Sequence, residues 1–466
     1  MPQIATIRRT QLDLSNRLDA EHYSPRFAST LSRVRSLQPV KLRRALREPV
    51  KTGHTPSTEN RRYYEPPAVK FIKTDNLRED RIDATDAQML SEAGNARIGG
   101  SELMQDDVIV TIIGATERII GRAARFQTAI GRSNINQNVA LIRSNIPAGY
   151  FSIFLNTSYG REQLIWLSRQ TGQVNLNCRE VEELLIPSFS PKFVDAIHRL
   201  NSDRHALLAE AESLYRRAEL GLLAALNLNG WTPRQTLSFV RQYSEGVAAV
   251  RLDAEYFHPK FREMFERIPV SVRLENLRRL VQFTKGIEVG ADAYRDSGVP
   301  FWRVSNLSRY GLDSENASFI EQGLYTKLKD TYEPKQGELL LSKDATPGLA
   351  FYLHRQVDGV ISSGILRLRF IADIAPHYLE LVLNSLVVQF QIEQASGGSV
   401  IKHWKLPQVR TTLIPRLPGN AEVELADLVK SSHEARDKAQ AMLEKGKKAI
   451  VTAIERDETV AFQLLQ

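Results

Sequence analysis

The chain has 466 residues, of which 42% are hydrophobic and 25% charged, and its formal net charge is 62 − 54 = +8. This length predicts two to four domains, and the apolar content excludes a disordered, collagen-like or low-complexity chain. The single cysteine, Cys178, excludes an internal disulfide and a thiolate zinc site. The basic charge is compatible with a polyanionic partner such as nucleic acid, but does not identify one.

The first residues of the chain carry Arg8 and Arg9 without an apolar stretch after them, so we expect no signal peptide. No run of residues is apolar enough to predict a transmembrane helix. These two patterns favour a cytoplasmic protein without a membrane partner.

Residues 1–190 mix short apolar runs with glycine and proline. Dense β-branched residues predict strands over 69–72, 107–113 and 138–143. Residues 150–167 predict a helix. This alternation is typical of an α+β domain.

A long helix is predicted to follow, because no further proline occurs between Pro191 and position 228. Apolar and small residues recur there at heptad spacing, which predicts a packed seam about 50 Å long at ~1.5 Å per residue. One series is Ile197, Arg204, Ala211, Ala218 and Ala225, and its partner series is Leu200, Leu207, Leu214 and Gly221. The alternative is that this helix is a buried core element of its own domain.

The chain also repeats itself. Residues 17–27 and 251–261 share seven of eleven positions, at an offset of 251 − 17 = 234. Weaker matches pair 71–77 with 301–307, 107–111 with 338–342, and 184–187 with 412–415. A repeat of this length indicates two homologous domains and not a solenoid.

The second copy ends in a similar heptad pattern. Its two series are Leu425, Ser432, Ala439, Gly446 and Ala453, and Leu428, Ala435, Met442 and Ala449, with Leu443, Ile450 and Ile454 widening the apolar face. Small residues in both seams would let the two helices approach closely. We therefore expect two α+β domains joined by two long antiparallel helices with pseudo-twofold symmetry. The predicted seam is represented by Leu200, Leu207, Leu214, Leu428, Met442 and Ile450.

The sequence offers no catalytic constellation. It lacks a P-loop, a dinucleotide-binding glycine pattern, H-E-x-x-H and G-x-S-x-G. Its nine histidines are dispersed, and the carboxylate pairs at 106–107 and 182–183 flank apolar runs, where capping or solvation is expected. We predict no catalytic residue, no metal site and no cofactor in this chain, so a binding or adaptor subunit is favoured over an enzyme.

Several motifs, repeated in the same order, resemble the DNA-specificity subunits of type I restriction–modification systems. They are Leu-Asp-Ala-Glu-(His/Tyr)-(Tyr/Phe)-x-Pro at 18–25 and 252–259, Gly-His-Thr-Pro at 53–56, the segment 300–307, Thr-Gly at 171–172, Ser-Gly-Gly at 396–398, and a long helix after each Leu-Ile-Pro. The second copy departs from the first at 286–289, where Gly-Ile-Glu-Val replaces Gly-His-Thr-Pro. The two loops should therefore differ in shape and in their contacts.

This resemblance implies two target-recognition domains, at 1–190 and at 231–417 with a linker over 231–250. Spacer helices would occupy 191–230 and 418–466. Each domain would read half of a split site in double-stranded DNA, and the helices would dock two methyltransferase subunits. S-adenosylmethionine would bind in those partners, and an ATP-dependent restriction or other defence subunit could join them.

Polar loop residues are the candidates for DNA contact, since arginine and lysine suit guanine or phosphate, and asparagine and glutamine suit adenine. In the first copy they are Lys51, Thr52, His54, Arg61, Arg62, Tyr63, Arg118, Asn134, Asn136, Gln137, Gln173, Asn175, Asn177 and Arg179. In the second copy they are Lys285, Arg303, Arg309, Tyr310, Lys343, Lys402 and His403. For each of them an ordinary turn or surface role is an equal alternative.

Two other classes of protein stay open at this point. A coiled-coil scaffold without sequence-selective DNA binding would use the heptads alone. A DNA methyltransferase with an unusual recognition half would bind S-adenosylmethionine itself.

Overall fold

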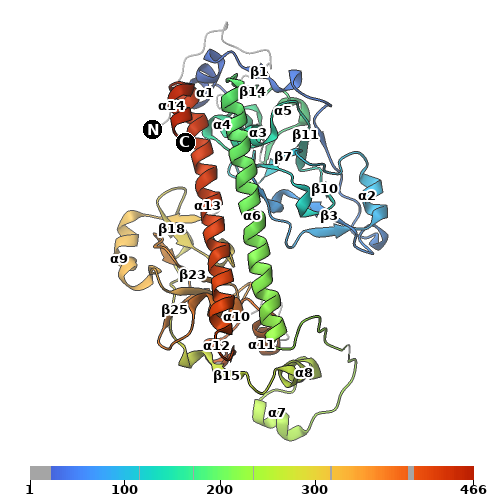
Figure 1. Ribbon diagram of the computed structural model, residues 1–466, viewed down its shortest axis with the longest axis vertical. Helices are drawn as coiled ribbons and strands as arrows, with labels where there is room; N and C mark the ends of the chain where they lie inside the picture. The colour runs from blue at the N-terminus through green and yellow to red at the C-terminus, as the bar shows by residue number, and fades with distance from the viewer. Residues whose placement is uncertain are drawn as a thin grey trace. The chain divides into compact units, whose positions relative to one another are not determined.

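A computed structural model describes residues 22–114, 116–171, 173–234, 236–314, 317–396 and 403–465 (Figure 1). The chain divides into two compact units, the first formed by residues 1–209 and 437–466 and the second by 210–436. Both boundaries fall inside long helices. Each unit thus combines a β-rich domain with half of α6 (Pro191–Ala225) and half of α13 (Ala421–Glu455).

The first unit contains three sheets of three or four strands, with the orders β2-β11-β7-β9, β10-β3-β6 and β12-β13-β8, and the pairs β1-β14 and β4-β5. Its strands are β1 (Val40–Lys41), β2 (Lys51–Thr52), β3 (Val69–Ile72), β4 (Leu77–Arg78), β5 (Arg81–Ile82), β6 (Gln88–Leu90), β7 (Val108–Thr111), β8 (Ile113–Gly114), β9 (Ala123–Arg125), β10 (Ser133–Ile135), β11 (Val139–Ile142), β12 (Arg169–Thr171), β13 (Gln173–Asn175) and β14 (Leu185–Ile186). Its shorter helices are α1 (Pro25–Ser36), α2 (Glu92–Ile98), α3 (Ala148–Leu155), α4 (Ser158–Leu167), α5 (Cys178–Val181) and α14 (Glu458–Gln463).

The second unit repeats part of this plan. Its described residues form two sheets, β16-β25-β22-β23 and β17-β21-β18-β24, and the pairs β15-β26 and β19-β20. Its strands are β15 (Arg273–Asn276), β16 (Val281–Lys285), β17 (Tyr294–Arg295), β18 (Val299–Trp302), β19 (Leu307–Ser308), β20 (Gly311–Leu312), β21 (Ser318–Ile320), β22 (Leu339–Ser342), β23 (Ala350–Tyr352), β24 (Val360–Ile361), β25 (Ile365–Phe370) and β26 (Leu413–Arg416). Its shorter helices are α7 (Tyr243–Ala249), α8 (Pro259–Arg267), α9 (Gln322–Tyr332), α10 (Pro376–Leu383), α11 (Leu386–Ser396) and α12 (Leu406–Thr411). In both copies one pair of strands is parallel, β3 with β10 and β18 with β24.

The three strands predicted in the first domain are present as β3, β7 and β11. The helical prediction over 150–167 is confirmed, but the structure divides this segment into two helices, α3 and α4. Thr157 begins α4 by accepting a hydrogen bond on its side chain from the Gly160 amide at 3.2 Å. Asn156 is buried and donates from Nδ2 to the Ala123 carbonyl at 2.8 Å, which fixes the break between the helices.

The long helices α6 and α13 pack together and run antiparallel (Figure 1). In the first unit Gly446 lies against Leu200, so that a Cβ at position 446 would be 3.1 Å from Leu200 Cδ2. In the second unit Gly221 lies against Leu425, and the Ser432 hydroxyl donates to the Ala211 carbonyl at 2.6 Å. Small residues allow this close approach, as the heptad pattern predicted.

The buried surface of α6 is wider than a two-helix seam. Leu200, Leu207 and Leu214 are half-buried, as are Leu428 and Met442 on α13, whereas Ile450 is buried. The buried residues of α6 include members outside both predicted series, namely Asn201, Tyr215 and Leu222. The reason is that α6 contacts its β-rich domain as well as α13, and both apolar cores include residues of the long helices.

Among the described residues, no helix is both long and apolar enough to cross a membrane.

Candidate nucleic-acid interface

In the first unit the predicted loop 53–56 follows strand β2 and is fastened to the end of β10. Gly53 donates its amide to the Asn136 carbonyl at 3.3 Å, and a Cβ at position 53 would lie 1.7 Å from the Ile135 carbonyl oxygen. No side chain fits at that approach. The exposed His54 directly follows this anchored glycine, and the Thr55 hydroxyl donates to Gln137 Oε1. Of these three side chains His54 and Gln137 were predicted to contact DNA, and Thr55 was not.

A second group forms where the 3₁₀ turn Arg61–Tyr63 meets helix α2. The Arg62 guanidinium lies over the Tyr63 ring at 4.9 Å and donates to its hydroxyl at 3.1 Å. The Ser91 amide at the start of α2 donates to the Tyr63 carbonyl at 2.9 Å, which positions the turn. The hydrogen bond from Arg62, with the positive charges of Arg62 and Arg97, lowers the pKa of Tyr63. A half-buried aromatic ring between arginines can contact a phosphate or stack on a base through its open part.

Two other predicted side chains lie in the interior. Asn134 is 1% exposed, accepts on Oδ1 from the Ser101 hydroxyl at 2.8 Å and donates to Asn95 Oδ1 at 2.7 Å. Asn136 is 6% exposed and accepts from the Asn138 amide at 3.2 Å. Their amides hold the loop in place and are not presented to solvent, so the alternative of a structural strand-edge role fits them better than base contact.

The remaining candidates of the first unit do not join either group. Lys51 is half-buried and pairs with Glu48 at 2.9 Å, and Thr52 beside it is half-buried on β2. Arg118 is exposed beyond β8, and Arg61 is exposed and pairs with Glu65 at 2.7 Å. Asn175, Asn177 and Arg179 are exposed at β13 and α5, where Asn177 caps α5 by accepting from the Glu180 amide at 3.0 Å. The Gln173 side chain lies outside the described part of the chain, although its backbone belongs to β13.

The second unit has the same close approach of a glycine to a backbone carbonyl, but different side chains follow that glycine. A Cβ at Gly286 would lie 2.2 Å from the Ser362 carbonyl oxygen, matching the close approach at Gly53. Glu288 stands where the first loop has Thr55, and it accepts from the Ser363 hydroxyl at 2.5 Å. Lys285, just before the glycine, is exposed. The predicted difference in contacts between the two loops is therefore present, on a shared backbone anchor.

Two further groups of the second unit contain predicted residues. The exposed Arg303 lies over the Tyr294 ring at 5.8 Å. Lys343 pairs with Asp344, which also accepts from the exposed His403 at 2.8 Å. Burial raises the pKa of Asp344, but hydrogen bonds from His403 and Lys343 outweigh it and lower that pKa. Lys402 lies outside the described residues.

Arg309 and Tyr310 face the long helices and are not part of an open loop surface. Arg309 pairs with Glu219 of α6 at 2.8 Å, and the Tyr310 hydroxyl donates to Glu212 at 3.1 Å. The Arg436 guanidinium of α13 lies 3.6 Å from the centre of the Tyr310 ring. These two predicted DNA contacts instead dock the β19–β20 turn on the helices within their unit.

Sequence reasoning missed several residues of these groups, namely Thr55, Arg97, Glu288, Tyr294 and Ser363. Arg97 lies on the short helix α2, and its only signal was an exposed basic residue near a helix end, which is common on any surface. Glu288 was visible as the departure from Gly-His-Thr-Pro, but its partner Ser363 comes 75 residues later and no spacing rule connects them.

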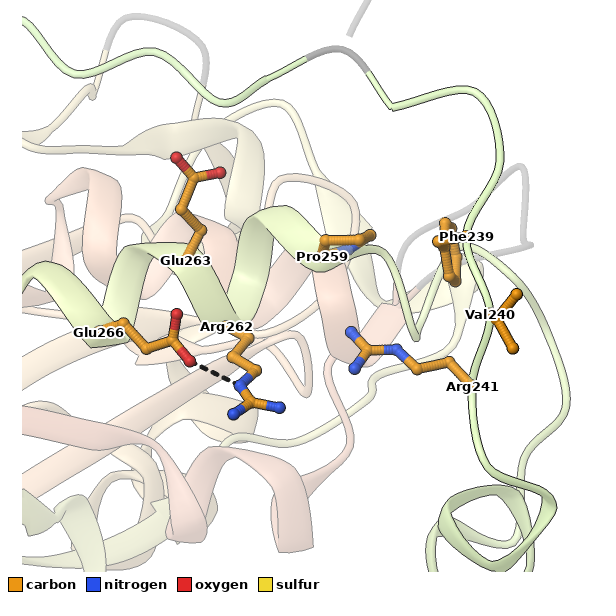
Figure 2. A pocket seen from close by; sticks show the side chains of 7 residues that line it. All are labelled: Phe239, Val240, Arg241, Pro259, Arg262, Glu263 and Glu266. Carbon is orange, nitrogen blue, oxygen red and sulfur yellow. Dashed lines mark hydrogen bonds and ion pairs between the residues drawn. The ribbon is translucent and has the colours of Figure 1, made fainter.

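Other concave or titratable features lie in the second unit. A shallow pocket of about 220 Å³ is lined by Phe239, Val240, Arg241, Pro259, Arg262, Glu263 and Glu266, with Arg262 and Glu266 paired at 2.6 Å (Figure 2). Its volume is below the range usual for cofactor or drug-sized ligands. Separately from this pocket, the buried side chains of His377, Glu380 and His433 form a cluster in the second unit.

The fold thus defines an α+β protein in which two β-rich domains are attached to two packed long helices. Over about a third of its length the chain is similar in sequence to a specificity subunit of a type I restriction enzyme. The EcoBI specificity subunit of Escherichia coli is 22% identical over 167 residues, which cover 34% of this chain. The match spans only 33% of that relative's length.

Solved structures of the same kind align over most of the chain at low identity. The S subunit from M. genitalium is 12% identical, with a TM-score of 0.33, covering 91% of this chain and 94% of that one. The HsdS subunit from Thermoanaerobacter tengcongensis is 13% identical, with a TM-score of 0.26, covering 91% and 95%. No family model matches the chain.

Proposed function

We propose that this protein is the DNA sequence-specificity subunit of a type I-like modification or defence complex, and that it recognises a bipartite DNA site. The observation that carries the proposal is the duplication of one β-rich domain with different side chains at equivalent loop positions. Thr55 and Gln137 in one copy correspond to Glu288 and Ser363 in the other. A shared framework with divergent polar loops suits two half-sites of different sequence.

In this proposal the chain is not itself an enzyme. Methyl transfer belongs to partner subunits that bind S-adenosylmethionine, and cleavage, where the complex cleaves, belongs to a further subunit. The half-buried leucines of α6 and the half-buried Leu428 and Met442 of α13 offer apolar surface to the helices of such partners.

The long helices set the gap between half-sites in this proposal. Each has 35 residues, which at ~1.5 Å per residue gives about 50 Å. We expect half-sites about one helical turn of DNA apart, as in dimeric readers. Inserting four residues into both α6 and α13 should lengthen the gap, and an unchanged gap would contradict the spacer role.

The decisive test is methylome sequencing of cells that carry this chain with its methyltransferase partner. Deleting the chain should remove a split methylation motif. Replacing Arg62 and Tyr63 by alanine should weaken or relax one half of that motif only, and replacing Lys285 and Glu288 should affect only the other half. The double variant at Arg262 and Glu266, an exposed ion pair on α8 that is not among the candidate DNA contacts, is the control and should leave both halves unchanged.

The same experiment separates the alternative classes. A scaffold predicts that no methylation motif depends on the loop residues, although complex assembly depends on the helices. A methyltransferase in this chain predicts S-adenosylmethionine binding by the purified chain alone, which the proposal does not expect.

A further inference from the structure

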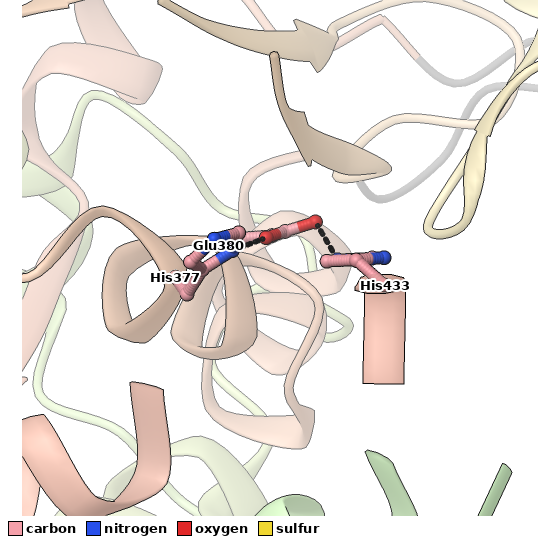
Figure 3. A group of neighbouring side chains, drawn as sticks. All are labelled: His377, Glu380 and His433. Atoms are coloured by element: carbon pink, nitrogen blue, oxygen red, sulfur yellow. Dashed lines mark hydrogen bonds and ion pairs between the residues drawn. The ribbon is translucent and has the colours of Figure 1, made fainter. Parts of the chain in front are cut away.

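Helix α10 and the first half of α13 bring together two histidines and a glutamate inside the second unit (Figure 3). His377 and Glu380 are one helical turn apart on α10, and His433 lies on α13. Glu380 is 0% exposed, His433 3% and His377 9%. The sequence predicted no metal site because these histidines are 433 − 377 = 56 residues apart, and only the fold makes them neighbours.

Their donor atoms converge on the carboxylate. His377 Nδ1 lies 2.9 Å from Glu380 Oε2, and His433 Nε2 lies 2.9 Å from Glu380 Oε1. One candidate ligand atom from each residue lies within 4.8 Å of the others. Ligands about 2.0–2.2 Å from a tetrahedral zinc ion are about 3.3–3.6 Å from one another. The separations here, from 2.9 Å up to 4.8 Å, span that range, so small side-chain shifts would close the group on a shared divalent ion.

The charge of this group is the second observation. The bonded partners of Glu380 among the described residues are two imidazoles, neither of which carries a permanent positive charge. A buried carboxylate needs a compensating cation.

The first unit also contains a buried carboxylate, but compensates its charge with an arginine. At the equivalent positions, 228 residues earlier, it has Gly149, Ser152 and His205. The buried carboxylate next to Ser152 and His205 is that of Asp80, which pairs with the permanent cation Arg204 at 2.7 Å. The second unit has two imidazoles around its buried carboxylate, whereas the first unit has an arginine beside its own.

We propose that His377, Glu380 and His433 bind one divalent transition-metal ion, and that zinc suits this set of two imidazoles and one carboxylate. The ion joins α10 to α13 inside the second unit, and a fourth coordination position remains for water or another donor. This proposal does not rest on DNA recognition by the chain.

The test begins with the wild-type full-length chain, free of any histidine tag and dialysed against a chelator. Titration with Co²⁺ should produce visible d–d absorption that saturates at one equivalent and disappears when Zn²⁺ is added. Zn²⁺ should also raise the melting temperature in a concentration-dependent way. Absence of saturable absorption and of any zinc-dependent shift in wild type would overturn the proposal, and would leave the group as a hydrogen-bonded triad without an ion.

Matched variants locate the site. Glu380→Gln and His433→Gln should each weaken Co²⁺ binding at least tenfold, as loss of a ligand does. His205→Gln, at the duplicate position in the first unit, and His403→Gln, an exposed histidine, should bind like wild type. If the Glu380 and His433 variants bound Co²⁺ as tightly as wild type, the ion would lie elsewhere and the proposal would be rejected. Circular dichroism checks that each variant is folded.

Discussion

In each unit an ion pair joins the equivalent β-turn to a long helix, but the turn residue is acidic in the first unit and basic in the second. In the first unit Glu79, on the β4–β5 turn, pairs with Lys447 of α13 at 2.8 Å. In the second unit Arg309, at the equivalent place on the β19–β20 turn, pairs with Glu219 of α6 at 2.8 Å. Lys447 and Glu219 are themselves equivalent, since 447 − 219 = 228. The ion pair keeps its position in the duplicated fold while both of its charges are exchanged.

This exchange has a physical benefit in a duplicated chain. If each turn met the helix position of the other copy, Arg309 would face Lys447 and Glu79 would face Glu219. Both pairings are repulsive, so the swapped charges disfavour mispairing of domain and helix during folding. The duplication thus preserves backbone geometry while allowing the chemistry of equivalent positions to diverge.

The largest effect is expected at the buried acid beside that turn. Asp80 pairs with Arg204 at 2.7 Å and accepts from Asn201 at 2.5 Å, and it is 0% exposed. Asp80→Ala should lower the free energy of unfolding of the first unit by about 3–5 kcal/mol, because Arg204 would remain buried without its counter-charge. Hydrogen exchange of first-unit amides measures this, with Glu79→Ala as the milder control. A loss below about 1 kcal/mol would contradict the role of the pair.

The next effect tests the swap itself. Glu79→Arg should destabilise the first unit by about 1–2 kcal/mol, and Lys447→Glu in the same chain should recover most of it. The reversal Arg309→Glu with Glu219→Arg should behave alike in the second unit. Combining Glu79→Arg with Glu219→Arg should give no recovery. Thermal unfolding of Glu79→Arg, of Lys447→Glu and of the variant with both changes gives the coupling energy of this pair, and strict additivity would remove the basis for matched docking.

The pH dependence of the first unit follows from Asp80. Burial raises its pKa, but Arg204, His205 and Ser152 outweigh burial and lower it below the usual value. A carboxyl with a lowered pKa contributes stability that is present above its unfolded pKa, about 3.9, and lost as the pH falls through the folded pKa. The stability difference between wild type and Asp80→Asn should therefore be constant from neutral pH down to about 5 and shrink below about 4. A difference that does not change with pH would contradict an ionised Asp80.

The smallest effect on stability is expected in the loops. Thr55→Val removes the hydrogen bond to Gln137 at the surface and should cost less than about 1 kcal/mol. Under the proposed function it should still alter the preference for one half-site, measured by methylome sequencing. Val289→Thr in the second loop is a comparison that leaves the Glu288–Ser363 contact in place. Unfolding of Thr55→Val at ordinary temperature would show that the contact is structural.

The repeat and the heptads could be predicted because they are periodic along the chain. Spacing shows which helix face is buried, but not which polar group it meets. Asn201 and Arg204 on α6 are buried because Asp80 reaches them from a turn more than 100 residues earlier. Asparagine is a residue type that contacts adenine, yet the side-chain amide of Asn134 is buried and donates to Asn95. Arg97 became a candidate only when folding placed it beside Tyr63.

Gly53 and Gly286, which lie against a backbone carbonyl at the start of each loop, should tolerate substitution much less than the residues that follow them. Any side chain at the anchor would collide with a backbone carbonyl, so a substitution there displaces the whole loop. The residues just after each anchor can change from histidine and threonine to isoleucine and glutamate without moving the attachment point. Each loop is therefore a variable segment attached at a fixed glycine. Libraries that randomise 54–55 or 287–288 while keeping the glycine should contain folded variants.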